Sequence, residues 1–175
     1  LKMALYSMGL QVQSLNACTL ISISANSYTG ALFADVIFKD LSTGSVFTTV
    51  MNYSGGVGQI NILVSSLPSP NGVYEVTLLE GGLEVARQPL LISCDIDCCL
   101  ANLTNELIDC ACDCPKCSSA LAKAQKVFLL LQSAKSTIEL ASTDAGSTNS
   151  GYYYDILQKY LKAKQICDNS CGCNC

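Results

Sequence analysis

The pattern of apolar and polar residues changes once along this chain, near Ser93. Before that point, short apolar runs alternate with clusters of Gly, Pro, Ser, Asn and Asp, which favour turns. In the segment Val73–Leu79 one face is apolar and the other is mixed, as in a half-buried strand. Seven strands are predicted, over residues 10–14, 18–24, 31–38, 46–51, 59–64, 73–79 and 83–92.

Short strands separated by turns every roughly 8–12 residues are typical of an antiparallel β-sandwich. The segments Asp40–Gly44 and Glu80–Gly82 are predicted to be hairpin loops between neighbouring strands. Gly55–Gly58 superficially resembles a phosphate-binding loop, but neither the Lys nor the helix of such a loop follows it, so a hairpin turn is predicted. The Cys…Trp…Cys pattern of immunoglobulin domains is absent, because the chain has no Trp. The term Ig-like therefore describes only the predicted architecture.

After residue 93 the apolar spacing becomes that of a helix. Ile96, Leu100, Leu103 and Leu107 step by four, three and four residues, which places them on one helical face. Pro115 marks a corner after this first helix. The sequence therefore predicts a helix that turns back on itself after the β-rich part.

A second, longer helix is predicted from Ser118 or Ser119, either of which can cap it, to about Ser142. Its centre, Val127–Leu131, is apolar on all sides, so we expect it to be buried on most sides. A third helix is predicted over residues 152–166. Its inner face is expected to carry Tyr153, Ile156, Tyr160 and Ala163.

The tyrosine run Tyr152, Tyr153 and Tyr154 has two interpretations, packing within the helical unit or an interface with a partner protein. Taken together, the periodicities predict an α+β chain with two domains. Residues 1–93 are expected to form an N-terminal antiparallel β-sandwich of Ig-like architecture with about seven strands. Residues 94–175 are expected to form a cysteine-rich domain of three helices.

Eleven of the twelve cysteines lie after the change in periodicity. Cys18 alone precedes it, within a strand pattern, and is predicted to be a small core residue. The others form three clusters: Cys94, Cys98 and Cys99 at the start of the first helix, Cys110, Cys112, Cys114 and Cys117 at the corner, and Cys167, Cys171, Cys173 and Cys175 in the tail. In an up-down-up bundle the corner and tail clusters are expected to meet, roughly 20 Å from the first cluster at about 1.5 Å per residue.

Disulfide bonds between the corner cluster and the tail cluster would staple a helical unit that is too small to be stable alone. Structural zinc is the alternative, with Cys110, Cys112, Cys114 and Cys117 as the ligands, because the last two have the usual two-residue gap. The tail spacing departs from paired Cys-x-x-Cys, and no ferredoxin-type spacing indicates an iron–sulfur cluster. Free buried thiols are a further alternative. Disulfides are the preferred interpretation, so no cofactor is expected, and structural zinc is the main alternative.

The composition argues against several functions. Half of the residues are apolar, only 14% are charged, and the net charge is -4. The scattered Lys and Arg form no basic patch, so nucleic-acid binding is not expected. No run reaches the roughly 18 apolar residues of a membrane span, and residues 1–10 make a poor signal peptide. Because the chain is apolar and has few charges, part of its surface is expected to be covered by other subunits. The alternative is a compact domain with an uncharged polar surface.

No catalytic constellation is predicted. The chain has no His. A cysteine nucleophile would therefore lack its usual base, and a metal hydrolase would lack one of its usual ligands. Asp95, Asp97, Asp109 and Asp113 stand among the cysteines, where caps and solvated charges are expected. The protein is therefore predicted not to be an enzyme.

The order of these features resembles a known family. A small β-sandwich runs into Leu90-Leu-Ile-Ser-Cys-Asp-Ile-Asp-Cys-Cys-Leu, then a cysteine-rich helical hairpin, then the terminus Cys-Gly-Cys-Asn-Cys. The chain in this respect resembles small virion proteins of tailed bacteriophages, including podoviruses and crAss-like phages, that form neck or tail rings. The resemblance implies a non-catalytic subunit that forms homo-oligomers and contacts other virion proteins.

Three functions therefore stay open. The first is a structural subunit at the neck or tail of a virion. Such a particle is assembled in the host cytoplasm and works outside the cell. Its disulfides would form after release and lock the assembled structure. The second is a disulfide-stapled extracellular adhesin-like binding module. The third is an intracellular adaptor stabilised by zinc.

Overall fold

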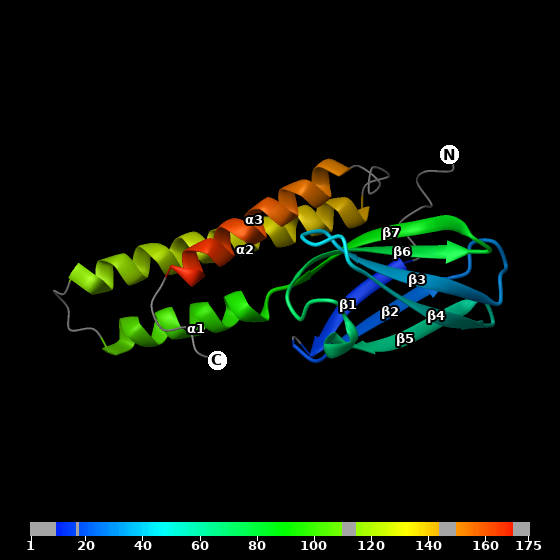
Figure 1. The fold of residues 1–175 in the computed structure, drawn as a ribbon, viewed down its shortest axis with the longest axis horizontal. Helices are drawn as coiled ribbons and strands as arrows, with labels where there is room; N and C mark the ends of the chain where they lie inside the picture. Colours follow the sequence, from blue (N-terminus) through cyan, green and yellow to red (C-terminus); the bar gives the residue numbers. More distant parts are fainter. Residues whose placement is uncertain (1–9, 17, 110–114, 144–149, 170–175) are drawn as a thin grey trace.

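The computed structural model describes residues 10–16, 18–109, 115–143 and 150–169, which form an antiparallel sheet followed by three helices (Figure 1). The fold is therefore α+β, as the change in periodicity predicts. The strands are β1 Leu10–Asn16, β2 Leu20–Asn26, β3 Phe33–Asp40, β4 Val46–Ser54, β5 Val57–Leu63, β6 Gly72–Glu80 and β7 Leu83–Ile92, with a short 3-10 helix, η1, at Val64–Ser66. The helices are α1 Cys94–Asp109, α2 Pro115–Thr143 and α3 Ser150–Asp168.

The strands hydrogen bond as one curled sheet in the order β1-β2-β5-β4-β3-β6-β7. Strands β4 and β5 pair only beside their hairpin, where Tyr53 is opposite Gly58 and Ser54 is opposite Val57. Because the sheet bends there, β1-β2-β5 and β4-β3-β6-β7 enclose a common core, and β1 comes to lie beside β7. The structure thus has one curled antiparallel sheet around a common core, which is broadly consistent with the predicted sandwich.

Two glycine pairs form the tightest hairpins, as the sequence predicts. Gly55 and Gly56 connect β4 to β5 with φ of 62° and 83°, and Gly81 and Gly82 connect β6 to β7 with φ of 58° and 81°. Positive φ at both central residues is the geometry of the type I′ turn, which matches the twist of the flanking strands. These turns therefore fix the register of both hairpins.

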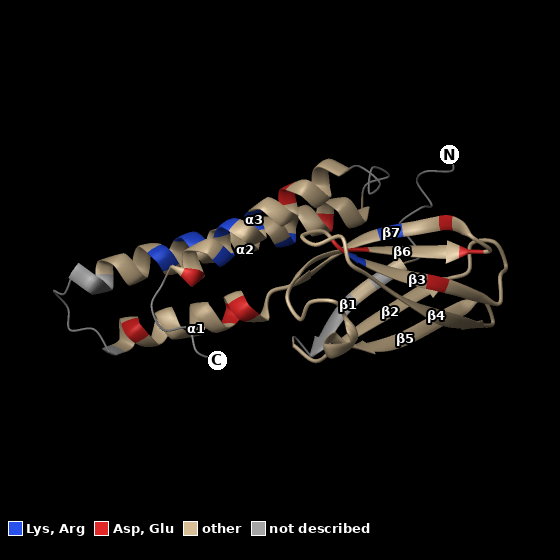
Figure 2. Ribbon diagram, viewed as in Figure 1, with Lys and Arg blue, Asp and Glu red and all other residues tan. Residues whose placement is uncertain are grey.

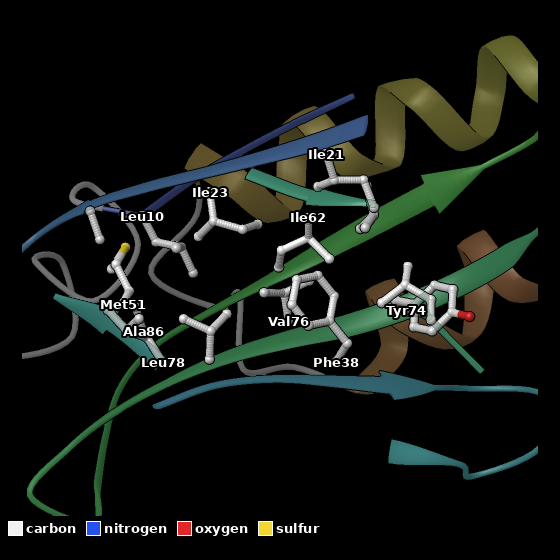
Figure 3. Close-up of a cluster of buried hydrophobic side chains, with 14 of the residues drawn as sticks. Leu10, Ile21, Ile23, Phe38, Met51, Ile62, Tyr74, Val76, Leu78 and Ala86 are labelled. Carbon is white, nitrogen blue, oxygen red and sulfur yellow. The ribbon is translucent and has the colours of Figure 1, made fainter. Parts of the chain in front are cut away.

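The main core lies inside the curl of the sheet (Figure 3). Its largest fully buried side chains include Phe38, Tyr74 and Leu78 on one side, and Ile21 and Ile23 on the other. Phe38 follows the alternating burial of β3, whereas β2 and β6 are buried on both faces over much of their length. At about 25 cal/mol per Å² of apolar surface, a buried side chain of this size stabilises the fold by roughly 2 kcal/mol.

Tyr74 closes one end of this core through its hydroxyl group. The hydroxyl donates to the carbonyl oxygen of Ser69 at 2.6 Å and accepts from the Ser69 N–H at 2.8 Å. A tyrosine near the start of a strand that bonds back to the preceding loop holds that loop against the sheet. This contact fixes the connection between η1 and β6.

The helices have a second core of their own. Ile96 and Leu103 of α1, Val127 of α2 and Ile156 of α3 are buried there, together with Val73 from β6. The inclusion of Val73 shows that the helical unit packs on the face of β6 that points away from the main core. The predicted inner face of the third helix is confirmed, because its buried residues are Tyr153, Ile156, Tyr160, Ala163 and Cys167.

Candidate assembly surface and disulfide framework

Two disulfide bonds between described cysteines tie the helical unit together and to the sheet. Cys18, in the β1–β2 turn, is bonded to Cys94, the first residue of α1, with 5.8 Å between their Cα atoms. Cys99 of α1 is bonded to Cys167 near the end of α3, with the same Cα separation. Cys98 is disulfide-bonded as well. The described part of the chain therefore contains disulfide bonds, as the preferred interpretation of the cysteines predicts.

The partners differ from the predicted arrangement of clusters. Cys167 of the tail cluster meets Cys99 at the start of the first helix, not the corner cluster. The reason is helix length: α2 has 29 residues and α1 has 16, so α2 runs back past the start of α1 to reach the sheet. From that far end, the 19 residues of α3 bring Cys167 back only to the first turns of α1.

The pairing of Cys18 corrects the prediction that it is a small core residue. It is exposed apart from its bond to Cys94, 76 positions away. No local signal indicates this pair. Only the placement of β1 beside β7, a tertiary feature, brings the end of the first strand to the end of the last.

Several predicted sulfur ligands lie outside the described residues. These are Cys110, Cys112, Cys114, Cys171, Cys173 and Cys175, and the side chain of Cys117 is not described either. Within the described residues, no three His, Cys, Asp or Glu side chains are grouped to hold a metal ion. Zinc at the corner cluster therefore stays a prediction.

A buried carboxylate organises the opposite end of the sheet. Glu80, at the end of β6, accepts hydrogen bonds from the N–H of Tyr28 at 2.9 Å, from the N–H of Thr29 at 2.7 Å and from the Thr29 hydroxyl group. The Tyr53 hydroxyl donates to it at 2.8 Å. Burial alone would raise the pKa of Glu80, but these donors together lower it below the ordinary value. Burial and the nearby carboxylate raise the pKa of Tyr53.

A second polar contact joins α1, α3 and the loop before β6. The carboxylate of Asp95 accepts from the Tyr160 hydroxyl at 2.9 Å and lies 3.5 Å from Nζ of Lys164. The Asp95 N–H donates to Oδ1 of Asn71 at 3.0 Å. Burial, and then the charge of Asp95, raises the pKa of Tyr160, so that hydroxyl stays a proton donor. Asp95 is therefore a structural contact, which agrees with its predicted role near a helix end.

The outer side of α2 is apolar and uncovered. Phe128 is 51% exposed and Leu129 is 63% exposed, although the run Val127–Leu131 was expected to be buried on most sides. Val127 and Leu131 are buried in the helical core and Leu130 packs against it partly buried, whereas Phe128 and Leu129 lie on the side of α2 that the other helices leave uncovered. Leu121 and Leu140 extend the uncovered apolar surface along the helix, and we call these four side chains the α2 face.

The three tyrosines of the predicted interface differ in how far they are exposed. Tyr153 is 4% exposed and packs inside the chain, so it is unavailable to a partner. Tyr154 is 66% exposed, and Tyr152 is partly exposed. Charge is also unevenly placed. Figure 2 shows Lys positions along the ribbons of α2 and α3, whereas β4 and β5 contain no charged residue.

No protein-family model matches this chain, and no curated protein matches it. None of the helices in the described ranges is long and apolar enough to cross a membrane.

Proposed function

We propose that this chain is a non-enzymatic structural subunit that assembles with copies of itself and with other proteins, as in the neck or tail of a bacteriophage virion. The uncovered α2 face carries this proposal. Phe128 and Leu129 are adjacent and both more than half exposed, and exposed apolar side chains that cluster on a surface mark candidate interaction sites. The disulfides of the described residues suit a particle that functions outside the reducing cytosol.

The β-rich part fits this role as an Ig-like sandwich, a scaffold that carries binding surfaces on its strands and edges. Two features support that assignment. The strands divide into β1-β2-β5 and β4-β3-β6-β7, joined by two residue pairs between β4 and β5. Tyr74 makes the hydroxyl-to-backbone contact that characterises the tyrosine corner of such domains.

A disulfide-stapled extracellular binding module is the second candidate. The bond between Cys18 and Cys94 favours it, because this bond fixes the sheet to the start of the helical unit, as expected of a small extracellular module. The two functions differ in their partner. The structural subunit binds copies of itself, and the binding module works as a single copy.

The test compares Leu129→Lys with the wild type and with Gln165→Lys, which adds the same charge at an exposed polar position of α3, outside the α2 face. We expect the wild-type chain to form oligomers in light scattering and rings or tubes in electron micrographs. Leu129→Lys should lower the mass of the particle, because a charge would have to be buried, and Gln165→Lys should not. A wild type that stays a single copy at high concentration would contradict the assembly function.

A further inference from the structure

We propose that strand β4 pairs antiparallel with β4 of a second copy, across a twofold axis at Val50. This proposal rests on the assembly function above and names one of its contacts. The observation that carries it is an open sheet edge without any of the usual protection.

Strand β4 has a partner on only one side along most of its length. It pairs with β3 from Val46 to Asn52, whereas its pairing with β5 is limited to Tyr53 and Ser54. The main-chain groups on its second side, before the hairpin, therefore have no strand opposite them. An open edge of this kind is a template for another strand.

The direction of these groups follows from one hydrogen bond. The Tyr53 N–H donates to the carbonyl oxygen of Leu32 at 2.9 Å, on the β3 side. Residues of an antiparallel strand present their main-chain groups alternately to its two edges. Thr48, Val50 and Asn52 therefore present N–H and C=O to the open edge.

The other side of the sheet shows how this protein protects an edge. Strand β7 carries Arg87, Glu84 and Pro89, which lacks an N–H, and its pairing with β6 shifts register next to Leu79. The end of α2 also covers β7, where Ser142 donates to Oε1 of Gln88 at 2.7 Å. Strand β1 likewise has an irregular register between Ser14 and Asn16.

Strand β4 has none of these protective features. Its sequence, VFTTVMNYS, contains no charge and no Pro, and its register with β3 is regular. Val46 and Val50 are 55% and 50% exposed, and Phe33 on the adjoining strand is 54% exposed. Helix α2 packs against β7 and α3 packs against β6, and Figure 1 shows the helical unit beyond one end of the strands. An uncharged apolar edge fits a partner that is itself uncharged and apolar.

A second copy of β4 is that partner. Thr48, Val50 and Asn52 are symmetric about Val50, so a twofold axis there places Val50 opposite Val50 and Thr48 opposite Asn52. Every outward N–H of the three then finds a carbonyl oxygen, and the two valine side chains meet on one face of the joined sheet. A twofold axis brings the same charges of the two copies close together, so this pairing suits an uncharged strand and not a charged one. The pairing joins the β4-β3-β6-β7 halves of two copies into one sheet.

The test uses charge at the axis. Val50→Lys alone and Val50→Glu alone each place like charges opposite each other, and we expect self-association through this edge to weaken by at least about tenfold. A mixture of the two variants places Lys opposite Glu, so association should return as a one-to-one pair in sedimentation velocity. Asn61→Lys, on the open edge of β5, is the matched control and should leave association unchanged.

Three results would overturn the proposal: both single variants associate like the wild type, the mixture fails to restore association, or Asn61→Lys alone abolishes it. Hydrogen exchange gives a second readout, since the Val50 amide should be protected in the wild-type assembly and exchange faster in Val50→Lys. Comparison with Leu129→Lys separates the two proposals. If Leu129→Lys abolishes association and neither Val50 variant weakens it, the α2 face is the contact and the edge pairing is overturned.

Discussion

The carboxylate of Glu80 is an ion held by neutral groups. It is 2% exposed, and its oxygens are satisfied by two backbone N–H groups and two hydroxyl groups. Hydrogen bonds to a charged group contribute more than those between neutral groups, roughly 1.5–3 kcal/mol each before the cost of burial. The net effect fixes the β2–β3 loop and the end of β4 in place.

Substitution Glu80→Gln should destabilise the chain by about 3 kcal/mol at pH 7, since one amide oxygen cannot replace a carboxylate and the amide NH₂ would face donors. The effect should depend on pH. The pKa of Glu80 is lowered on folding, so its contribution is complete above 4.5, its ordinary value, and is lost as the pH falls through the folded value. Urea unfolding at several pH values would measure this. A difference between wild type and variant that grows on acidification would contradict it.

At the level of single residues, the sequence indicates the core positions that recur with helical spacing. It does not indicate residues whose partners are distant in sequence. Ile96 and Ile156 could be assigned to a core because helical spacing depends on neighbours in sequence. Glu80 precedes two glycines and looks like a turn residue, and its donors are about 50 residues away. Cys18 is likewise explained only by a partner 76 positions away.

Among whole elements, the length of α2 decides the geometry of the helical unit. Periodicity predicts three helices and the inner faces of the first and third, and those predictions are confirmed. It does not predict how far each helix runs past its neighbour, so the expected meeting of tail and corner clusters was wrong for Cys167. Nor does an apolar run show how many of its sides are covered, which is why Phe128 and Leu129 were misplaced.

The bond between Cys99 and Cys167 should carry much of the stability of the helical unit. It closes a loop of 68 positions, and loss of a native disulfide in a small domain costs about 2–5 kcal/mol, because the unfolded chain gains freedom. We expect the double variant Cys99→Ala, Cys167→Ala to unfold at lower denaturant, with α3 leaving α1 before the sheet unfolds.

Hydrogen exchange of α3 amides would test this order. Wild-type protein treated with reductant is the control, and it should be destabilised at least as much because it also loses the bond of Cys18 to Cys94. Unfolding of α3 and the sheet at one denaturant concentration in the double variant would show that the bond does not govern the order.

For the molecule as a whole, the disulfides and the uncovered surfaces have complementary roles. One bond fixes the sheet to the helical unit and another fixes α3 to α1, so the α2 face and the β4 edge are held on one framework. Two different uncovered surfaces on a subunit permit assemblies larger than a dimer, because each copy can contact more than one neighbour. This is the property that a ring or tube requires.

The assembly should be nearly insensitive to salt. The β4 edge contains no charge, and the α2 face consists of Leu and Phe side chains, so apolar burial rather than charge attraction drives association. Raising the salt from about 0.1 M to about 1 M shortens the screening length from about 10 Å to about 3 Å, which removes attraction between exposed charges. Sedimentation velocity of the wild type should therefore give the same particle at both concentrations.

The mixture of Val50→Lys and Val50→Glu is the internal control for salt, because its pairing depends partly on charge and should weaken as salt rises. If high salt dissociates the wild-type assembly as it does the mixture, charge attraction by the lysines of α2 and α3 drives assembly instead. These would then contact acidic residues of α1 in a neighbouring copy, where Asp97 and Glu106 are exposed. The comparison therefore decides between apolar and electrostatic assembly.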